Sequence, residues 1–257
     1  IGTSGIRGSC IDDAENELVS HHITFTGSHP SQDIHEQDPA AWLQQLEHLL
    51  YEISRLLHQL DSSCRISAIS IDGTSGTLIA CKKDGTPLSP ALMYNDQQSR
   101  KQAAIINRHA PARSAVHGAA SSLAKALLLL EKYPDTEVFC FQADWLAASF
   151  TGLYGISDEN NCLKLGYDSI TQQWPDWLHD KQGIFIPEQL LPQVVAPGSA
   201  IAKVTPVLIK KYQLAPDCIV VAGTTDSNAA VLATGANQPG DAVTSLGSTL
   251  VIKVFSD

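Results

Sequence analysis

The sequence is organised around one stretch near its end, Ala222-Gly223-Thr224-Thr225-Asp226-Ser227-Asn228-Ala229-Ala230-Val231. The apolar run 218–222 predicts a buried strand that Gly223 ends, and a helix is expected over 227–234 with Asp226 as its N-cap residue. Because a helix N-terminus favours the charged form of a carboxyl group, we expect Asp226 to be ionised at neutral pH. An ionised carboxylate can act as a general base. For these residues alone, however, a purely structural cap is the commoner role.

The composition limits the class of protein. The 257 residues are 44% hydrophobic and 17% charged, which is typical of a globular protein. A formal charge of −10 argues against nucleic acid or an acidic membrane surface as the main partner, and no apolar run is long enough to cross a bilayer. The six cysteines are scattered without a Cys-x-x-Cys pair, so we expect them to be reduced in a cytoplasmic protein.

Three further turns rich in glycine and hydroxyl side chains lie beside predicted strands. The chain opens on Gly2-Thr3-Ser4-Gly5, and a related turn, Asp72-Gly73-Thr74-Ser75-Gly76, follows the alternating strand 65–71. The third, Ser245-Leu246-Gly247-Ser248-Thr249, lies between two apolar runs. Such turns let the backbone approach an anion closely, although an ordinary hairpin turn explains each of them alone. The recurrence of the turn predicts related hairpins around the first and second of them.

The segment Leu92-Met93-Tyr94-Asn95-Asp96 begins with apolar residues and ends with two adjacent polar residues. Asp96 is expected to cap a helix that runs to about residue 108, and the pattern fits helix capping and polyol binding equally well. Two other helices are clearer: one begins at Asp38-Pro39 and carries leucines at helical spacing to about residue 60, and one spans about 121–133. Lys125 lies in the first turn of the latter helix, and we expect it to be solvated.

Together these motifs resemble the FGGY carbohydrate kinases over nearly the whole chain. Gly2-Thr3-Ser4 with Arg7 is similar to the first phosphate motif of that family, except that Ile6 replaces its second serine, and Gly223-Thr224-Thr225-Asp226 is similar to the loop that supplies its catalytic base. Further matches in the same order as in the family are Tyr94-Asn95-Asp96, Ser121-Ser122-Leu123-Ala124-Lys125, Asp144-Trp145-Leu146 with Thr151-Gly152, and Ser245-Leu246-Gly247-Ser248-Thr249.

The resemblance implies an α/β fold of the ribonuclease-H-like, actin/hexokinase type, with a mixed sheet flanked by helices. Residues 1–236 would form the N-terminal sugar-binding domain without its first strand, and 237–257 the start of a nucleotide-binding domain that continues beyond the chain. The aspartate that helps this family to hold magnesium would precede Ile1, and the adenine site would follow residue 257. We therefore expect residues 1–257 alone to lack kinase activity.

The resemblance also implies ATP and Mg²⁺ as cofactors and suggests roles for individual residues. Asp226 would be the catalytic base, and no metal ligand is assigned within the chain. The phosphates would be bound by Gly2, Thr3, Ser4, Gly247, Ser248 and Thr249, and the sugar by Asp72, Ser75, Asn95, Asp96 and Asp226.

Departures from the family pattern narrow the choice of substrate. Asp72 and Thr74 stand where xylulokinases carry Gln and His, and Gln98 stands where they carry Arg. The resemblance is therefore to the ribulokinase-like, xylulokinase-related branch, which implies phosphorylation of the terminal hydroxyl of a ketopentose, D-ribulose first and D-xylulose second. Two alternatives stay open: a non-catalytic sugar-binding or regulatory protein on the same scaffold, and a kinase for another polyol such as glycerol. The expected partner is a small sugar, and a homodimer is also open.

Overall fold

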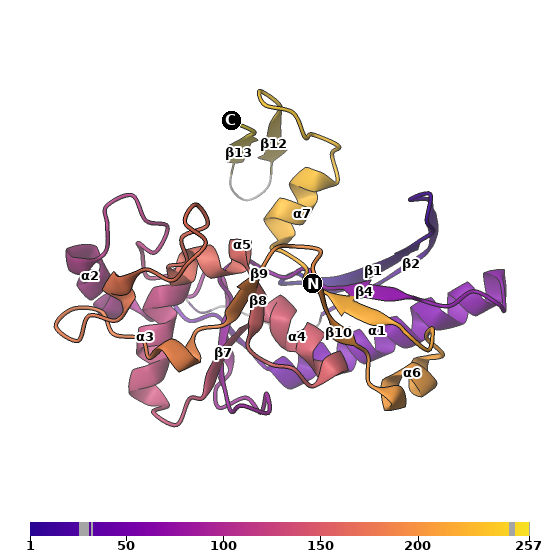
Figure 1. The fold of residues 1–257 in the computed structure, drawn as a ribbon, viewed down its shortest axis with the longest axis horizontal. Coiled ribbons are helices and arrows are strands. Elements are labelled where there is room, and N and C mark those ends of the chain that lie inside the picture. Colours follow the sequence, from indigo (N-terminus) through magenta and orange to yellow (C-terminus); the bar gives the residue numbers. More distant parts are fainter. Residues whose placement is uncertain (26–30, 32, 247–249, 257) are drawn as a thin grey trace.

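A mixed α/β body carries a small separate hairpin. The structure is a computed structural model that describes residues 1–25, 31, 33–246 and 250–256. Strands run through the middle of the body with helices on either side, and the last two strands stand apart from it beyond a short connecting helix (Figure 1). In the part of the chain so described, no helix is long and apolar enough to cross a membrane.

The strands of the body form several small sheets. A four-stranded antiparallel sheet has the order β3-β6-β5-β7, and a three-stranded sheet has the order β10-β11-β4, in which β11 and β4 run parallel. These strands are β3 (Glu36–Gln37), β4 (Ala68–Ser70), β5 (Leu78–Cys81), β6 (Ala91–Leu92), β7 (Val138–Phe141), β10 (Ala200–Lys203) and β11 (Ile219–Val221). The two-stranded sheets pair β1 (Gly5–Ile11) with β2 (Glu17–Thr24), β8 (Ile156–Asp158) with β9 (Gln193–Val195), and β12 (Ala242–Leu246) with β13 (Leu250–Val254).

The predicted hairpin around the turn 72–76 is wrong. β4 and β5 flank this turn but lie in different sheets, because β4 pairs in parallel with β11 while β5 pairs with β6 and β7. Every residue of β5 is buried, so this strand belongs to the interior rather than to a half-exposed hairpin. The hairpin predicted around the first turn is also displaced: the turn 2–5 precedes β1, and β1 pairs antiparallel with β2 through a turn at residues 12–16.

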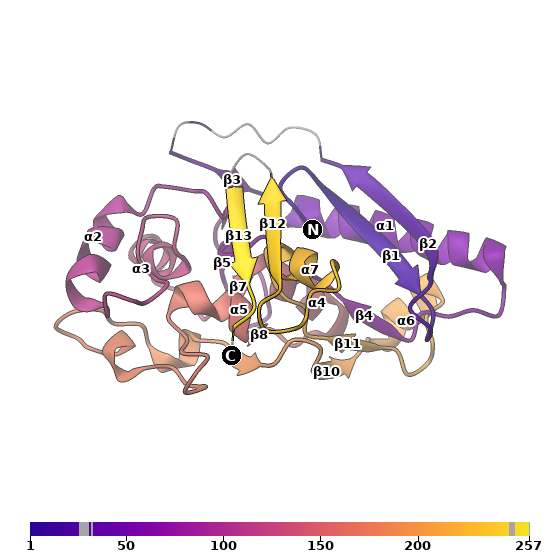
Figure 2. The same cartoon turned by 90° about the horizontal axis from the view of Figure 1, so that it is seen from above.

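Seven α-helices are found among the described residues: α1 (Pro39–Leu60), α2 (Arg100–His109), α3 (Ser122–Lys132), α4 (Gln142–Thr151), α5 (Glu159–Cys162), α6 (Pro206–Tyr212) and α7 (Asp226–Leu232). The predicted start of α1 is confirmed, because Asp38 is its N-cap and Oδ1 accepts a 2.9 Å hydrogen bond from the amide of Ala40. Its apolar stripe packs on the β1–β2 hairpin, which lies along the helix (Figure 2). Short 3₁₀ helices occupy 163–165, 176–178 and 188–190.

Two hydrophobic clusters build the core. One joins α1, α4 and β11, and the other joins α2 and α3 to β5 and β7, so that the helices cover the sheets from opposite sides. All six cysteines are free, as predicted, and Cys81, Cys140, Cys162 and Cys218 are buried. The helix α3 was predicted correctly, with Ser121 as its N-cap, whose Oγ accepts from the amide of Ala124 at 3.2 Å.

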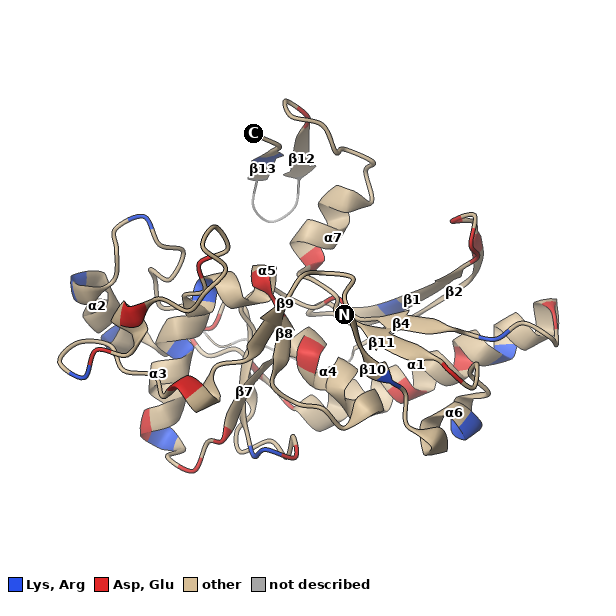
Figure 3. Ribbon diagram, in the orientation of Figure 1, with Lys and Arg blue, Asp and Glu red and all other residues tan. Residues whose placement is uncertain are grey.

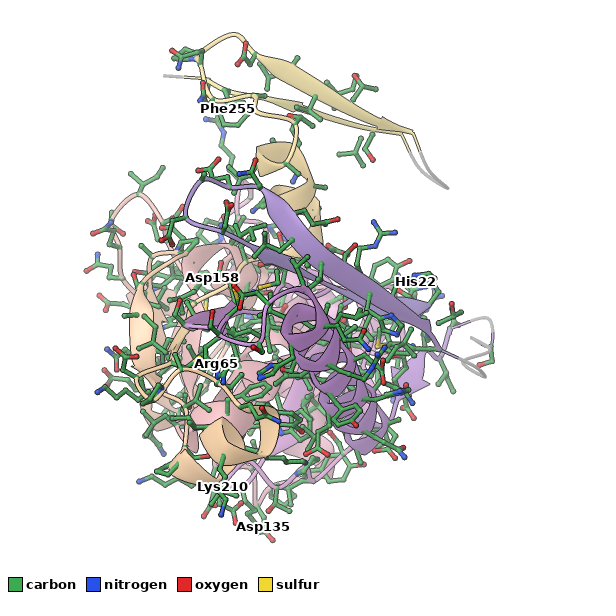
Figure 4. All side chains as sticks on the ribbon, turned by 90° about the vertical axis from the view of Figure 1, so that its right-hand side faces the viewer. His22, Arg65, Asp135, Asp158, Lys210 and Phe255 are labelled. Atoms are coloured by element: carbon green, nitrogen blue, oxygen red, sulfur yellow. The ribbon has the colours of Figure 1, made fainter. Side chains whose placement is uncertain are left out.

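The β12–β13 hairpin stands above the body, with Phe255 close to its end (Figure 4). It contacts the rest of the chain through Lys253, whose Nζ donates to the carbonyl oxygen of Ser227 at 2.8 Å and to Oδ1 of Asn228 at 2.6 Å. Both acceptors lie in the first turn of α7. The hairpin is therefore tied to the helix that follows the decisive stretch of sequence.

Candidate active site

The site forms where β4 and β11 end. Because the two strands are parallel, the loops after them emerge at the same edge and bond to each other. The amide of Thr224 donates to Oδ1 of Asp72 at 2.8 Å, the amide of Gly73 donates to the carbonyl oxygen of Thr224 at 3.2 Å, and the amide of Asp226 donates to the carbonyl oxygen of Gly73 at 2.7 Å. A Cβ on Gly223 would lie 1.9 Å from the carbonyl oxygen of Ile71, so only glycine allows this approach.

Asp226 is not the N-cap of its helix, contrary to the prediction. The helix α7 begins at Asp226, and the cap position belongs to Thr225, whose side chain makes no capping bond. The reason is tertiary: the bond from the amide of Asp226 to Gly73 places this residue inside the first turn. The side chain is exposed, and the start of α7 appears as an acidic segment in Figure 3. Its carboxyl group is thus accessible to a ligand.

The environment of Asp226 acts on its ionisation in two directions. Desolvation by the surrounding loops raises the pKa of this carboxyl group above the ordinary value, although the side chain keeps an exposed surface. The backbone amides of Ser227 and Ser75 and the ammonium group of Lys164 oppose the rise. The net shift of the Asp226 pKa is upward, because desolvation has a larger effect than these stabilising groups. The amide of Ser75 also brings this predicted sugar residue to the predicted base.

Thr224 is held by residues that the sequence did not single out. Nδ2 of Asn160 donates to Oγ1 of Thr224 at 3.0 Å, and that hydroxyl donates to Oδ1 of Asp158 at 3.4 Å. Asp158 is buried and also accepts bonds from the amides of Asn160 and Asn161. The only signal in the sequence was a cluster of polar residues over 158–161. This network fixes the base loop through the hydroxyl of Thr224, whereas Asp72 fixes it through the amide of the same residue.

The turn 72–77 is fixed by buried hydrogen bonds. Oε1 of Gln142 accepts from both the amide and the hydroxyl of Thr74, at 2.9 and 2.8 Å, and the hydroxyls of Thr74 and Thr77 lie 2.6 Å apart. Gly76 has a φ of +84°, which favours glycine. Asp72 and Ser75 are only half-buried, so their side chains remain within reach of a ligand.

Asn95 and Asp96 face in different directions. Asn95 is exposed, and its Oδ1 lies 2.5 Å from Nδ1 of His35. Asp96 is fully buried; its Oδ2 accepts from the amide of His35 at 2.8 Å, and its Oδ1 accepts from the amide of Gln98 at 3.0 Å. Its predicted role as a helix cap is wrong, because α2 begins at Arg100 with Ser99 as its N-cap. The carboxylate of Asp96 fixes the turn on which Asn95 stands.

Two lysines approach the site. Lys125 is fully buried, not solvated as expected, and its Nζ donates to the carbonyl oxygens of Gly76 and Met93, each at 2.7 Å. Burial lowers the pKa of Lys125 to about 7. Lys164 is half-buried, with its Cδ 3.4 Å from the position that a Cβ on Gly76 would take. Desolvation lowers the pKa of Lys164, and the charge of Asp226 opposes this shift.

The predicted phosphate-binding residues are described only in part. Gly2, Thr3 and Ser4 form a turn before β1, in which Nε2 of Gln37 donates to the carbonyl oxygen of Thr3 at 3.1 Å. Ser4 is exposed and the other two are half-buried, so the turn is open to a ligand. Residues 247–249, the second phosphate turn, lie outside the described residues. The described part of the chain holds no group of three or more His, Cys, Asp or Glu side chains that could bind a metal ion.

Comparison with known proteins finds similarity to carbohydrate kinases. A xylulose kinase of Lactococcus lactis is 25% identical over 268 residues, which cover 99% of this chain and 52% of that protein. A kinase from Brucella ovis described as a xyloylose kinase has a crystal structure that matches with a TM-score of 0.87 and 25% identity, over 98% of this chain and 53% of that one. The structure of Plasmodium falciparum glycerol kinase with ADP matches in fold alone, with a TM-score of 0.86 and 19% identity, over 98% of this chain and 52% of that one.

These matches confirm the predicted fold class, a mixed α/β domain of the actin-like type. The chain spans about half the length of these relatives. The sequence profile of the FGGY family of carbohydrate kinases, N-terminal domain, matches residues 1–233, which is most of the chain. The chain therefore belongs to the FGGY family of carbohydrate kinases.

Proposed function

We propose that this chain supplies the sugar site and the catalytic base of an ATP-dependent kinase that phosphorylates the terminal hydroxyl of a ketopentose. The observation that carries the proposal is the position of Asp226. Its exposed carboxyl group stands on a loop that is hydrogen-bonded to Asp72 and Gly73, within reach of the amide of Ser75. The proposed base would thereby stand next to polar groups that can bond to sugar hydroxyls.

In the proposed reaction, the carboxylate of Asp226 accepts the proton of the terminal sugar hydroxyl while that oxygen attacks the γ-phosphorus of ATP. The bond from the γ-phosphorus to the bridging oxygen breaks, and ADP leaves with the electron pair. Bound ATP with Mg²⁺ supplies the phosphoryl group and the positive charge that such a transfer needs. Because the described residues hold no metal cluster, no residue of this chain is assigned to the ion. The chain contributes position and proton acceptance.

Polar groups of two turns would bind the sugar. Asp72 and Ser75 belong to the first turn and are half-buried, and Asn95 belongs to the second and is exposed. One oxygen of Asp72 already accepts from Thr224, which leaves the other for a sugar hydroxyl. We propose that Asp96 contributes to the sugar site by fixing the turn that carries Asn95. The oxygens of its buried carboxylate accept hydrogen bonds from His35 and Gln98.

Two sugars compete within the ketopentose class. Asp72, Thr74 and Gln98 differ from the xylulokinase pattern, and we propose D-ribulose first on that ground. The relatives that are named for xylulose support D-xylulose as the second candidate. A carboxylate at position 72 accepts hydrogen bonds only, whereas an amide both donates and accepts, so the two residues suit different hydroxyl patterns.

We also propose which segments of the chain form each domain and which residues bind the phosphates. Residues 1–236 would form the sugar-binding domain, and 237–257 would begin the nucleotide-binding domain. Gly2, Thr3 and Ser4 would contact the phosphates of ATP from the first domain, and Gly247, Ser248 and Thr249 from the second. The exposure of the opening turn supports the first half of this assignment.

The decisive experiment is an ATP-turnover assay on the full-length protein with a panel of pentoses, gluconate and glycerol. D-ribulose should give the highest kcat/KM and D-xylulose the next. Asp226→Asn should lower turnover with the best sugar by about 10²–10⁴, the usual contribution of a general base, and should leave sugar binding almost unchanged. Binding without turnover in the wild type would favour a non-catalytic sugar-binding protein. Preference for glycerol would refute the ketopentose assignment.

A further inference from the structure

Lys125 occupies an unusual place for a lysine. It is fully buried in the first turn of α3, and none of the ion pairs among the described residues involves it. Its Nζ donates to two backbone carbonyl oxygens, those of Gly76 and Met93, at 2.7 Å each. Lysine is almost never fully buried without a paired charge, because desolvating an ammonium group is costly. An apolar side chain would fill the same volume without that cost.

The two carbonyl groups belong to the two turns that carry the proposed sugar residues. Gly76 lies in the turn that contains Asp72 and Ser75, and Met93 stands just before Asn95 and Asp96. These turns come from different strands, since the first precedes β5 and the second follows β6. The side chain of Lys125 therefore links both halves of the proposed sugar site from beneath.

The bonding capacity of Lys125 fits this link in either charge state. An ammonium group has three N–H donors and a neutral amine has two, so both forms can serve the two carbonyl groups. Burial lowers the pKa of Lys125 to about 7; the charge of Asp96 opposes this shift and that of Lys164 adds to it. The link is therefore retained when the lysine loses its proton.

The first turn also supports the base. The carbonyl oxygen of Gly73 accepts from the amide of Asp226 at 2.7 Å, and Oδ1 of Asp72 accepts from the amide of Thr224 at 2.8 Å. Gly76, which Lys125 holds, lies three residues along the same turn from Gly73, which holds the amide of Asp226. Lys125 thus acts on the site only through the backbone that it holds.

We propose that Lys125 is a positioning residue that sets the spacing between the turns 72–77 and 93–96, and thereby determines how tightly the sugar is bound. It is buried beneath both turns and does not touch the substrate. This inference rests on the proposed function, because it assigns the sugar to these turns. It predicts that loss of the two donors weakens sugar binding selectively, while the nucleotide is bound as before.

The test compares Lys125→Met with Lys132→Met in the full-length protein. Methionine has a similar length but no donor, and Lys132 is an exposed lysine in the last turn of the same helix. The Kd of D-ribulose and D-xylulose is measured by calorimetry, and KM for sugar and for ATP by ADP release. Lys125→Met should raise the sugar Kd and KM by roughly tenfold or more, as expected for two lost hydrogen bonds. The KM for ATP should change less than about twofold, and Lys132→Met should behave as the wild type.

Equal changes in the KM for sugar and for ATP, or no change in either, would overturn the inference while leaving the proposed function intact. A wild-type protein that binds no ketopentose would overturn the proposed function and the inference with it. If Lys125→Met does not fold, ¹⁵N-lysine labelling of the wild type replaces it. D-ribulose, and not ATP, should then shift the Nζ resonance of Lys125, and an unmoved resonance with bound sugar would refute the positioning role.

Discussion

The buried amine of Lys125 predicts a specific dependence of stability on pH. Burial lowers its pKa to about 7 in the folded protein, whereas a lysine in an unfolded chain titrates near about 10.4. Below both pKa values the folded and the unfolded protein each bind the proton, so Lys125 does not make the free energy of unfolding depend on pH. Between them the unfolded state binds more protons than the folded state, and the free energy of unfolding must therefore rise with pH.

The size of this rise follows from the two pKa values. One pKa unit corresponds to about 1.36 kcal/mol, so Lys125 should contribute about 1.4 kcal/mol more stability at pH 8 than at pH 6, and about 2.6 kcal/mol more at pH 9. Lys125→Met removes the titrating group and should remove this gain. All other titrating groups are shared, so the effects of those that lie far from Lys125 cancel in the difference between the two proteins.

The assay is urea unfolding of the wild type, Lys125→Met and Lys132→Met at pH 6, 7, 8 and 9. The wild type should gain stability over Lys125→Met as pH rises, and Lys132→Met, which changes an exposed lysine, should run parallel to the wild type. A direct titration of the Lys125 side chain by NMR should give a midpoint near the same pH. Parallel curves for the wild type and Lys125→Met would refute the reasoning, since they would mean that the buried amine keeps an ordinary pKa.

Three further predictions concern the proposed site. Asp72→Ala should raise the KM for the ketopentose far more than the KM for ATP, because a hydrogen bond to a charged group contributes about 1.5–3 kcal/mol. The matched variant Asp72→Asn keeps an acceptor for the amide of Thr224. Equal effects of Asp72→Ala on the KM of both substrates would mean that Asp72 does not belong to the sugar pocket. In the pH profile of kcat/KM, the midpoint of the acidic limb should lie above the pKa of an ordinary aspartate, because desolvation raises the pKa of Asp226. Lys164→Met should move this midpoint to still higher pH, because it removes a positive charge that lowers the pKa of Asp226. A midpoint that does not move would contradict the assignment of Asp226 as the base. A protein limited to residues 1–257, about half the length of the relatives, should bind D-ribulose weakly at most in calorimetry and release no measurable ADP, and robust turnover would place the nucleotide site within these residues.

The capping predictions show where local sequence falls short. Asp38, Asp96 and Asp226 all precede helical patterns and were all expected to begin or cap helices. Only Asp38 does so: its Oδ1 accepts from the amide of Ala40, and no distant donor within the described ranges bonds to its carboxylate. Asp96 and Asp226 are taken up by contacts from other parts of the chain.

The sequence by itself determined the polar turns, the helix α1, the free cysteines and the stretch that carries Asp226, because each depends on residue type and short-range spacing. The family followed from the order of these motifs. Local pattern also allowed β4 and β5 to be read as one hairpin, since strand propensity does not specify a partner strand.

Only the tertiary structure decided which of these groups meet. The bonds from Thr224 to Asp72 and from Asp226 to Gly73 join positions about 150 residues apart, and the parallel pairing of β4 with β11 brings them together. Lys125 looks like a solvated lysine in the sequence, because nothing in its own helix accepts its protons. Its two acceptors are backbone carbonyl oxygens, which every residue carries, so no pattern of side chains can reveal them.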